Sequence, residues 1–449
     1  MQKKELELDR HLKVLAKSSI IVFIIILFSK ILTYAYRIII ARQYGPEAYG
    51  LLSLSLIIVG GFTIFSLLGL ETGIVRYISF YLGKKDYNKV SYITKFSFKF
   101  LLVTGIISGV LLFSFSGLIA EKIFLNSKLS LFLKLFSLTI PLTILKGACF
   151  GMMQSYEKIG LTQFISKILD PFVKVIGIVI FFYLGMDIIG IPLSYLIAAV
   201  VAFLFSYLFC RIYFKKIFKI NPKKNKKLAK EIFSYSWPLV FFSISLWVLH
   251  SADSFMIGLL KGVEDVGFYN VAIPLSLLLT VSIDIFGNMF FPIVTKEYAK
   301  GNKENVKQLS QQTGKWVYMV SLPLFVLLII FPGAFIKILF GEEYLIAENA
   351  LRFLSIAAMF TAVFEPSKRL ILMKGKSKLI FKNTFLALAL NVILNLIFIP
   401  LYGITGAAIA TMISIGFLGL ILAFQAWKLL GIVPLRRKMI NITFVALIP

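Results

Sequence analysis

Eight basic residues lie inside long apolar stretches of this sequence, where a charge is costly. They are Lys30, Arg37, Lys99, Lys134, Lys146, Lys167, Lys174 and Arg352. A cation in hydrocarbon costs roughly 2.5 to 3.5 kcal/mol, so such residues usually face a protein interior or a water-filled cavity. Side chains near helix ends can instead extend to the polar surface, which is our interpretation of Lys99, Lys134 and Arg352. The other five are candidates for binding an anion.

The spacing of these five cations places several of them together. Lys30 and Arg37 are seven residues apart, and Lys167, Asp170 and Lys174 follow at positions i, i+3 and i+7, so each set shares one face of a helix. With Lys146, they predict a positively charged cavity suited to a diphosphate or an acidic sugar. The alternative is a structural ion pair in which Asp170 neutralises a neighbouring lysine.

The second half of the chain carries titratable residues in its apolar stretches. These are His250 and Asp253, three residues apart, with Asp284 and Glu365. Such groups could bind a coupling proton or Na⁺, or each could be a packing residue with satisfied hydrogen bonds. The membrane potential is a further candidate for the driving force. We expect no other cofactor and no catalytic residue. A metal site is not expected either, since the two cysteines, Cys149 and Cys210, both lie in apolar runs.

The elements that position these residues are long apolar helices. The chain of 449 residues is 59% hydrophobic and 15% charged, whereas soluble domains are about 25% charged. Its apolar runs have the length of about 20 residues that crosses a bilayer as a helix, and they lack the alternation of a β-barrel strand. We predict an all-α polytopic membrane protein with about twelve spans, at residues 18–41, 50–75, 96–119, 129–153, 163–184, 188–210, 234–260, 267–295, 313–336, 349–373, 379–399 and 404–427.

The distribution of basic residues predicts the orientation. With both termini inside, the inner segments hold 35 Lys and Arg residues and the outer segments hold 5. Cytoplasmic loops carry the excess of positive charge, so we expect a multi-pass protein of the cytoplasmic membrane with both termini in the cytoplasm. Because the basic residues are spread over every inner loop and form no single patch, a nucleic-acid partner is not expected.

A basic linker divides the chain into halves that resemble each other. We predict a six-helix lobe at 1–210, a cytoplasmic linker at 211–233, a second six-helix lobe at 234–430 and, at 431–449, a tail or the start of a further helix. Ala48-Tyr49-Gly50-Leu51 parallels Gly267-Phe268-Tyr269-Asn270, and Ile188-Ile189-Gly190 parallels Ile404-Thr405-Gly406, at nearly the same offset. Internal repeats of this kind are typical of secondary transporters.

Three motifs resemble those of a known family. Ala41-Arg42-Gln43-Tyr44-Gly45-Pro46-Glu47-Ala48-Tyr49-Gly50-Leu51 is similar to the join between the first two helices of the polysaccharide-export flippases. The second motif, Leu68 to Tyr77 followed by Gly83-Lys84-Lys85-Asp86, resembles the end of their second helix. The third comprises Asn391-Val392-Ile393-Leu394-Asn395 and the stretch from Ile399 to Ala408, and it resembles the join of their helices 11 and 12.

This resemblance implies the Wzx-like branch of the multidrug/oligosaccharidyl-lipid/polysaccharide exporter superfamily, with two pseudo-symmetric lobes in a V shape. Its members turn over polyprenyl-diphosphate-linked oligosaccharides. The implied partners are therefore a lipid-linked oligosaccharide, membrane lipids and glycan-assembly enzymes of the membrane.

Two alternatives remain. A drug or cation antiporter of the same superfamily would show an acidic cavity, and the seven cations in the first-half spans count against it. A membrane-embedded glycan polymerase or ligase would need a sizeable outer loop for its catalytic residues, but the longest outer segments here have only about ten to twelve residues. We therefore expect a transporter and not an enzyme.

Overall fold

The computed structural model describes residues 2–223 and 225–432, with side chains described from Phe28 onward except at 242, 246, 288 and 289. Within that range the chain forms helices joined by short turns and no strand. This confirms the predicted all-α class. The predicted tail at 431–449 lies almost entirely outside the described residues.

The chain forms two compact units. The first unit is Ile31–Gly267, and the second is Met1–Lys30 together with Phe268–Pro449. Helix α1 (Gln2–Leu67) begins in the second unit and continues through the first. The first unit then contains α2 (Leu70–Gly83), α3 (Tyr87–Leu118), the π-helix η1 (Ile119–Ile123), α4 (Ser127–Ser137), α5 (Thr139–Ser155), α6 (Ile159–Phe164), the π-helix η2 (Ile165–Leu169), α7 (Asp170–Tyr183), α8 (Gly190–Tyr213), α9 (Lys215–Lys219) and α10 (Lys226–Leu260).

The second unit is built from the later helices. Helix α11 (Val263–Leu277) begins at the end of the first unit, and the remaining elements follow in order: the 3₁₀-helix η3 (Leu278–Thr280), α12 (Val281–Ala299), α13 (Lys303–Ile330), α14 (Pro332–Leu339), the 3₁₀-helix η4 (Glu342–Ala347), α15 (Glu348–Met373) and α16 (Ser377–Leu430). The most extensive contact among them joins α15 and α16.

Nine helical stretches in the described residues are long and apolar enough to cross a membrane. Two of them, Phe28–Gly83 and Ser377–Leu430, each hold two predicted spans. The predicted span 163–184, which holds the end of α6, the π-helix η2 and α7, is not among the nine. It nevertheless forms helix from α6 through α7, so all twelve predicted spans are helical.

Two glycines break the longest helices where the sequence predicts connections between spans. Gly45 has φ 77° and ψ −179° inside α1, and Gly403 has φ 58° and ψ −135° inside α16. Side chains other than glycine rarely adopt positive φ, since their Cβ would clash with the backbone. Proline adds to both breaks, at Pro46 directly after Gly45 and at Pro400 shortly before Gly403.

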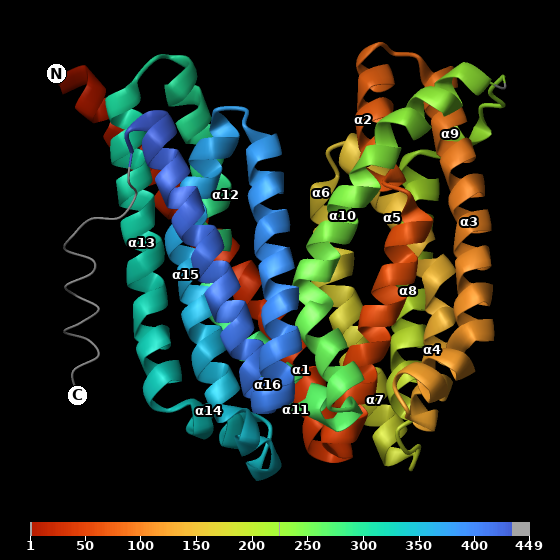
Figure 1. Cartoon of the computed structure of the whole chain (residues 1–449). Coiled ribbons are helices and arrows are strands. Elements are labelled where there is room, and N and C mark those ends of the chain that lie inside the picture. Colours follow the sequence, from red (N-terminus) through yellow and green to blue (C-terminus); the bar gives the residue numbers. More distant parts are fainter. Residues whose placement is uncertain (1, 224, 433–449) are drawn as a thin grey trace. The chain divides into compact units, whose positions relative to one another are not determined.

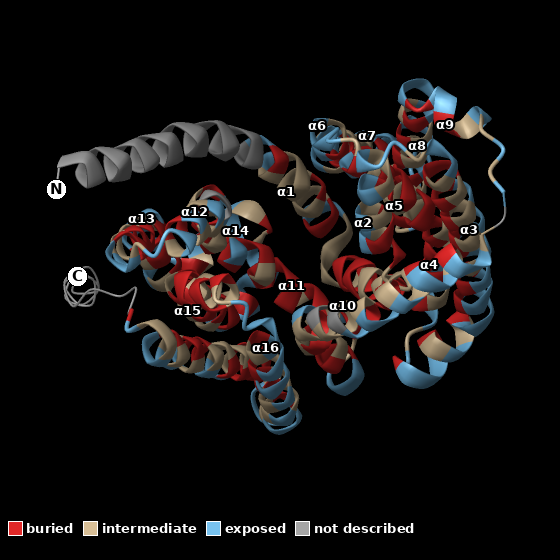
Figure 2. Ribbon diagram, turned by 90° about the horizontal axis from the view of Figure 1, so that it is seen from above, coloured by how far each residue is buried: buried red, intermediate tan, exposed pale blue. Residues whose placement is uncertain are grey.

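Small residues let the helices of the first unit approach closely. Helices α3, α4, α5 and α8 lie side by side (Figure 1). A Cβ at Gly105 of α3 would lie 3.0 Å from Pro141 of α5, and one at Gly177 of α7 would lie 2.9 Å from Ser194 of α8. Small residues at such crossings are typical of helix packing in membranes. Figure 2 shows the buried faces turned toward neighbouring helices. Apolar residues of α3 such as Ile106 and Val110 are exposed.

Helix α10, which falls in the predicted second lobe, packs on α2 within the first unit. A Cβ at Gly69 would overlap the carbonyl oxygen of Ser236, and one at Gly73 would overlap its hydroxyl. The Tyr77 hydroxyl also donates a hydrogen bond to the carbonyl of Glu231 at 3.2 Å. The predicted lobes rest on the sequence repeat and stay a prediction.

A buried carboxylate closes the turn between α12 and α13. Glu297 is 1% exposed and accepts hydrogen bonds from Lys300 at 2.9 Å, Asn305 at 3.0 Å and Asn302 at 3.1 Å. Burial alone would raise its pKa, but these donors outweigh burial and lower the pKa of Glu297 from 4.5 to about 2. The native state therefore favours the ionised carboxylate more strongly than the unfolded chain does.

We expect this carboxylate to make stability depend on pH. A depressed pKa contributes stability that is fully present above pH 4.5 and is lost as the pH falls toward 2, here on the order of 3 kcal/mol. Glu297→Gln should lower the thermal unfolding midpoint at pH 7 and weaken its fall below pH 4.5. Glu304→Gln, at an exposed side chain of the same turn, is the control. Parallel pH curves for wild type and Glu297→Gln would contradict the assignment.

Candidate functional site

An ion-pair cluster lies among the helices of the first unit. Asp170 accepts a hydrogen bond from Lys174 at 2.6 Å, and Lys146 lies 3.9 Å from its other oxygen. The three side chains are 13%, 16% and 18% exposed, respectively. Of the predicted cations, Lys146 and Lys174 are thus brought together around one carboxylate.

The π-helix η2 decides which residues join this cluster. Asp170 begins α7 directly after η2, and Pro171 follows at the first turn, where a missing N–H costs nothing. Lys174 is one α-helical turn beyond Asp170, so the two side chains meet. Lys167 lies inside η2 and is exposed. Because a π turn holds more residues than an α turn, α-helical spacing does not apply to Lys167.

Tyrosines surround the cations of the cluster. The ammonium of Lys174 lies 4.5 Å from the ring centroid of Tyr195 and 5.8 Å from that of Tyr36, within the range of cation–π attraction. Arg37, on the same helix as Tyr36, donates a hydrogen bond to the hydroxyl of Tyr49 at 3.3 Å. The rings of Tyr36, Tyr49 and Tyr195 are buried. They hold the cations without neutralising them.

Glu71 is a member of the cluster that the sequence prediction missed. It interacts electrostatically with Lys146, and a Cβ at Gly147 would lie 3.8 Å from its carboxylate. Its position inside the predicted span 50–75 could have revealed it, because an acid in an apolar helix is as unusual as a cation. Lys146 and Lys174 thus face two carboxylates, Glu71 and Asp170. Arg37 lies beside tyrosines that it shares with Lys174, and with Arg37 counted the cluster has a net positive charge.

Lys30 belongs to the second unit and is partly exposed. The structure does not place it relative to Lys174. Its role in binding stays a prediction.

The four candidate coupling residues are divided between the two units. His250 is exposed and Asp253 half-buried on α10 in the first unit. In the second unit, Asp284 is exposed on α12, and Glu365 of α15 is 13% exposed. The structure therefore does not gather them into one described site.

Glu365 is held by two basic residues of the predicted span 349–373 that were not among the candidate cations. Lys368 and Arg369 contact its carboxylate at 3.3 and 3.1 Å. Arg369 also donates a hydrogen bond to the carbonyl of Gly287 at 2.6 Å. Glu365 is therefore an ion-paired carboxylate that also links α15 to α12 through Arg369.

Two asparagines of the third sequence motif form a buried polar pair in the second unit. Asn395 donates to Asn391 at 3.1 Å, and Asn391 donates to Thr411 at 3.1 Å. This pair links the two halves of α16 across the Gly403 break. Among the described residues, His, Cys, Asp and Glu form no cluster of three that could hold a metal ion.

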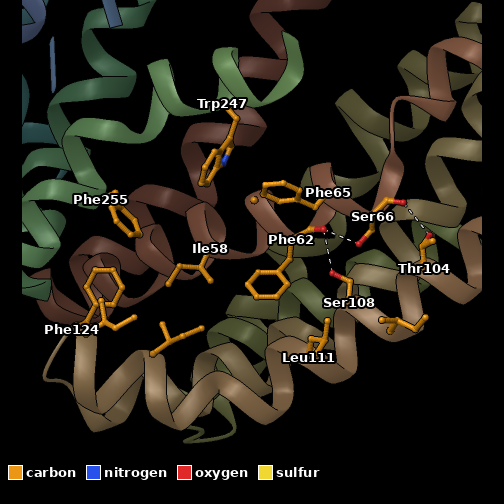
Figure 3. A pocket seen from close by; sticks show the side chains of 14 residues that line it. Ile58, Phe62, Phe65, Ser66, Thr104, Ser108, Leu111, Phe124, Trp247 and Phe255 are labelled. Carbon is orange, nitrogen blue, oxygen red and sulfur yellow. Dashed lines mark hydrogen bonds between the residues drawn. The ribbon is translucent and has the colours of Figure 1, made fainter. Parts of the chain in front are cut away.

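An apolar pocket of about 540 Å³ lies elsewhere in the first unit. Its walls come from α1, α3, η1 and α10, and Figure 3 shows Phe62, Leu111 and Trp247 on different sides of it. Nothing in the sequence patterns had indicated this pocket.

Two families match this chain. Residues 15–298 match the family described as polysaccharide biosynthesis protein. Residues 238–397 match the family described as MatE. The first match covers more than half of the chain.

Individual relatives agree with the first of these families. The chain is 25% identical over 388 residues to a putative O-antigen transporter of Shigella flexneri, which covers 84% of this chain and 89% of that protein. It is also 25% identical over 441 residues to an uncharacterized membrane protein of Methanocaldococcus jannaschii, covering 93% of this chain and 84% of that protein.

Solved structures share the fold at low sequence identity. An inward-facing multidrug resistance MATE family transporter of the MOP superfamily matches with a TM-score of 0.76 and 14% identity, over 90% of this chain and 94% of that one. The lipid II flippase MurJ in an inward closed conformation matches with a TM-score of 0.75 and 17% identity, over 96% and 91% of the two chains. These matches confirm the fold that the motifs imply.

Proposed function

Because this chain belongs to the family of polysaccharide biosynthesis proteins, we propose that it is a flippase for polyprenyl-diphosphate-linked oligosaccharides in the cytoplasmic membrane, working by alternating access. The relatives with named activities are transporters and flippases, and the chain is a transporter, not an enzyme. Membrane lipids surround it, and the enzymes that assemble the glycan are its expected partners.

The observation that carries the proposal is the net positive cluster among membrane-spanning helices. The short contact from Lys174 to Asp170 and the longer one from Lys146 leave Lys146 able to bind a second anion without breaking the tighter pair. A substrate diphosphate has the charge and the oxygen acceptors to bridge Lys146, Lys174 and Arg37. Asp170 would then keep the lysines paired while no substrate is bound, which limits the cost of their burial.

The antiporter of the same superfamily is the second candidate, since residues 238–397 match the MatE family. Glu71 and Asp170 give the cluster two acids, as a cation site would need. Lys146 and Lys174 balance that charge, however, and Arg37 adds a further positive charge that would repel a cationic drug. The net charge of the cluster therefore favours an anionic substrate.

Deletion of the gene tests the proposal. We expect the deletion strain to lose its surface glycan and to accumulate the lipid-linked oligosaccharide, and the wild-type gene on a plasmid should restore both. An unchanged surface glycan with no accumulated intermediate would refute the flippase and would turn attention to drug sensitivity, which an antiporter deletion should increase.

Cytoplasmic termini follow from the distribution of basic residues. We expect a cysteine at Asn225 to be protected from a membrane-impermeant maleimide in intact cells, and a cysteine at Glu121 to be labelled. The native Cys149 and Cys210 are buried, so background labelling should be low. Labelling of Asn225→Cys from outside the cell would show that the orientation is opposite to the predicted one.

Coupling is assigned to Asp253, with His250 one turn away and with Asp284 and Glu365 as further candidates for a proton or Na⁺. Asp253→Asn removes a titratable charge about two turns before the end of α10, so we expect it to abolish the dependence of flipping on pH or Na⁺. Transport into vesicles across a series of pH and Na⁺ values measures this. If flipping by Asp253→Asn depended on pH and Na⁺ as in wild type, Asp253 would be a packing residue, and the membrane potential would be favoured as the driving force.

A further inference from the structure

The apolar pocket of the first unit is lined by three membrane-spanning helices. Its lining comes from residues 58–66 of α1, residues 104–111 of α3 and two aromatic residues of α10, with η1 at one end. Its volume of about 540 Å³ is within the range of roughly 300 to 1,000 Å³ that is typical of small-molecule sites. It is therefore large enough to hold part of a ligand.

The chemistry of the lining excludes an anionic or strongly polar ligand. No lining side chain is charged. Its three hydroxyls all donate to backbone carbonyls: Thr104 to Ser66 at 3.0 Å, Ser108 to Phe62 at 3.2 Å and Ser66 to Phe62 at 2.8 Å. These bonds are drawn in Figure 3. A phosphate would thus lose its hydration with few donors in return, whereas a hydrocarbon would lose nothing.

Aromatic residues give the pocket its shape. The indole of Trp247 packs on Gly60 and Gly61 of α1, where added Cβ atoms would lie 3.0 and 3.1 Å from it. At the other end, Phe124 and Phe255 meet edge to face at 5.5 Å. Figure 3 shows Phe62 and Ile58 between these two ends. The walls are thus formed by packed rings and do not require a ligand to order them.

The helix that lines the pocket also leads to the charged cluster. Ser66 lines the pocket, and Leu67 next to it and Glu71 both lie close to Gly147, the neighbour of Lys146 on α5. The turn at Leu68 and Gly69 separates the end of α1 from Glu71 on α2, so the apolar lining ends five residues before the first carboxylate of the cluster. A ligand with an anionic head joined directly to an apolar tail matches this arrangement, in which an apolar pocket adjoins a charged cluster.

We propose that this pocket binds a stretch of the isoprenoid tail of the flipped lipid while its diphosphate occupies the cluster of Lys146, Asp170 and Lys174. This inference rests on the proposed flippase function and adds the tail to what the protein recognises. A polyprenyl chain is longer than the pocket, so the rest of the tail stays in the bilayer. Burial of the bound stretch contributes affinity in proportion to the apolar area that it covers.

Photo-crosslinking tests the site. The probe is a polyprenyl monophosphate with a diazirine in its tail, added to the purified full chain in phosphatidylcholine nanodiscs, with crosslinked residues mapped by mass spectrometry. We expect crosslinks at the lining residues of α1, α3 and α10, reduced by an excess of unlabelled polyprenyl phosphate. Crosslinks confined to other helices would overturn the proposal, and so would equal labelling of the pocket by a diazirine phosphatidylcholine that polyprenyl phosphate fails to displace.

Filling the pocket provides the matched variants. Ile107 and Leu111 line the pocket from α3 and are 54% and 44% exposed, so larger side chains there need not disturb the helix core. Ile107→Trp with Leu111→Trp should reduce the pocket crosslinks at least tenfold. Val110→Trp, on the same helix at 59% exposure but outside the lining, should stay within twofold of wild type. Undiminished labelling in the double variant would refute the site.

The same variants separate this inference from the flippase function. In the deletion strain, the double variant should restore less surface glycan than Val110→Trp at equal expression. If the double variant restored wild-type glycan with unchanged crosslinking, the tail site would fail and the flippase would stand. If the deletion itself left the glycan unchanged, the proposed function would fail whatever the crosslinks showed.

Discussion

Replacing Lys174 with alanine is expected to abolish most flipping while leaving the protein folded and expressed. Lys174 is 16% exposed, makes the 2.6 Å contact to Asp170 and lies over the ring of Tyr195. Removing one partner of a buried charged contact costs about 2 to 5 kcal/mol, which corresponds to a loss of roughly 30-fold or more in binding. Restoration of surface glycan in the deletion strain, with expression checked by immunoblot, measures the effect.

Related variants separate charge from geometry at this position. Lys174→Arg keeps the charge but changes the donor geometry, so only partial rescue is expected. Lys99→Ala removes an exposed cation of α3 and should be mild. Lys30→Ala is expected to resemble Lys174→Ala if Lys30 also contacts the head group.

The opposing carboxylate distinguishes substrate binding from a structural ion pair. Asp170→Asn combined with Lys174→Gln removes both charges and should leave the protein folded but still unable to flip the substrate. If Lys174→Ala, Lys30→Ala and Lys99→Ala all restored glycan equally well, the cationic binding site would have to be abandoned.

A single methyl group at Gly50 or at Gly267 is expected to destabilise the protein severely. A Cβ at Gly50 would overlap the carbonyl oxygen of Val263, and one at Gly267 would overlap that of Pro46. Here the backbones of α1 and α11 cross within the first unit, so no side chain can move to make room. Overpacking typically lowers stability by about 1 to 3 kcal/mol and occasionally by more. The cost is highest where two backbones clash, because main-chain atoms cannot rotate away as a side chain can.

Thermal unfolding of the purified variants measures this effect. Gly50→Ala and Gly267→Ala should lower the midpoint by many degrees or prevent recovery of monodisperse protein. Gly117→Ala is the matched control, since a Cβ there meets nothing within 4 Å, and alanine favours a helix by roughly 0.5 to 1 kcal/mol. Wild-type midpoints for Gly50→Ala and Gly267→Ala would show that this crossing is looser than the structure has it.

These two glycines illustrate what the sequence alone already indicated. Both belong to the motifs by which the halves of the chain resemble each other, and both lie at predicted ends of spans. Helix positions, the breaks near Gly45 and Gly403 and the membrane class could be predicted because each depends on local composition. The free energy of transfer into hydrocarbon is a sum over single residues, and positive φ at a glycine depends on the backbone at one position.

The partners of the buried charges depended instead on tertiary structure. Sequence spacing placed Lys167 beside Asp170 and Lys174, but Lys167 lies in the π-helix η2 and is exposed. Lys146, which the sequence had grouped with them, does lie 3.9 Å from Asp170. Arg369 was not among the candidate cations, yet it donates hydrogen bonds to Glu365 and to the carbonyl of Gly287. Spacing predicts neighbours only within one regular helix, whereas each of these contacts is made between helices or follows an irregular turn.

The apolar pocket of the first unit could be found only from the tertiary structure. Phe62, Ile107 and Trp247 are ordinary apolar residues of three separate spans, and nothing in their own segments distinguishes them from residues that face lipid. The sequence by itself determined that these segments are helices able to cross a membrane, because hydrophobicity acts locally. Only the packing of α1, α3 and α10 decided which of their apolar side chains enclose a cavity, because a cavity is the space that distant elements leave between them.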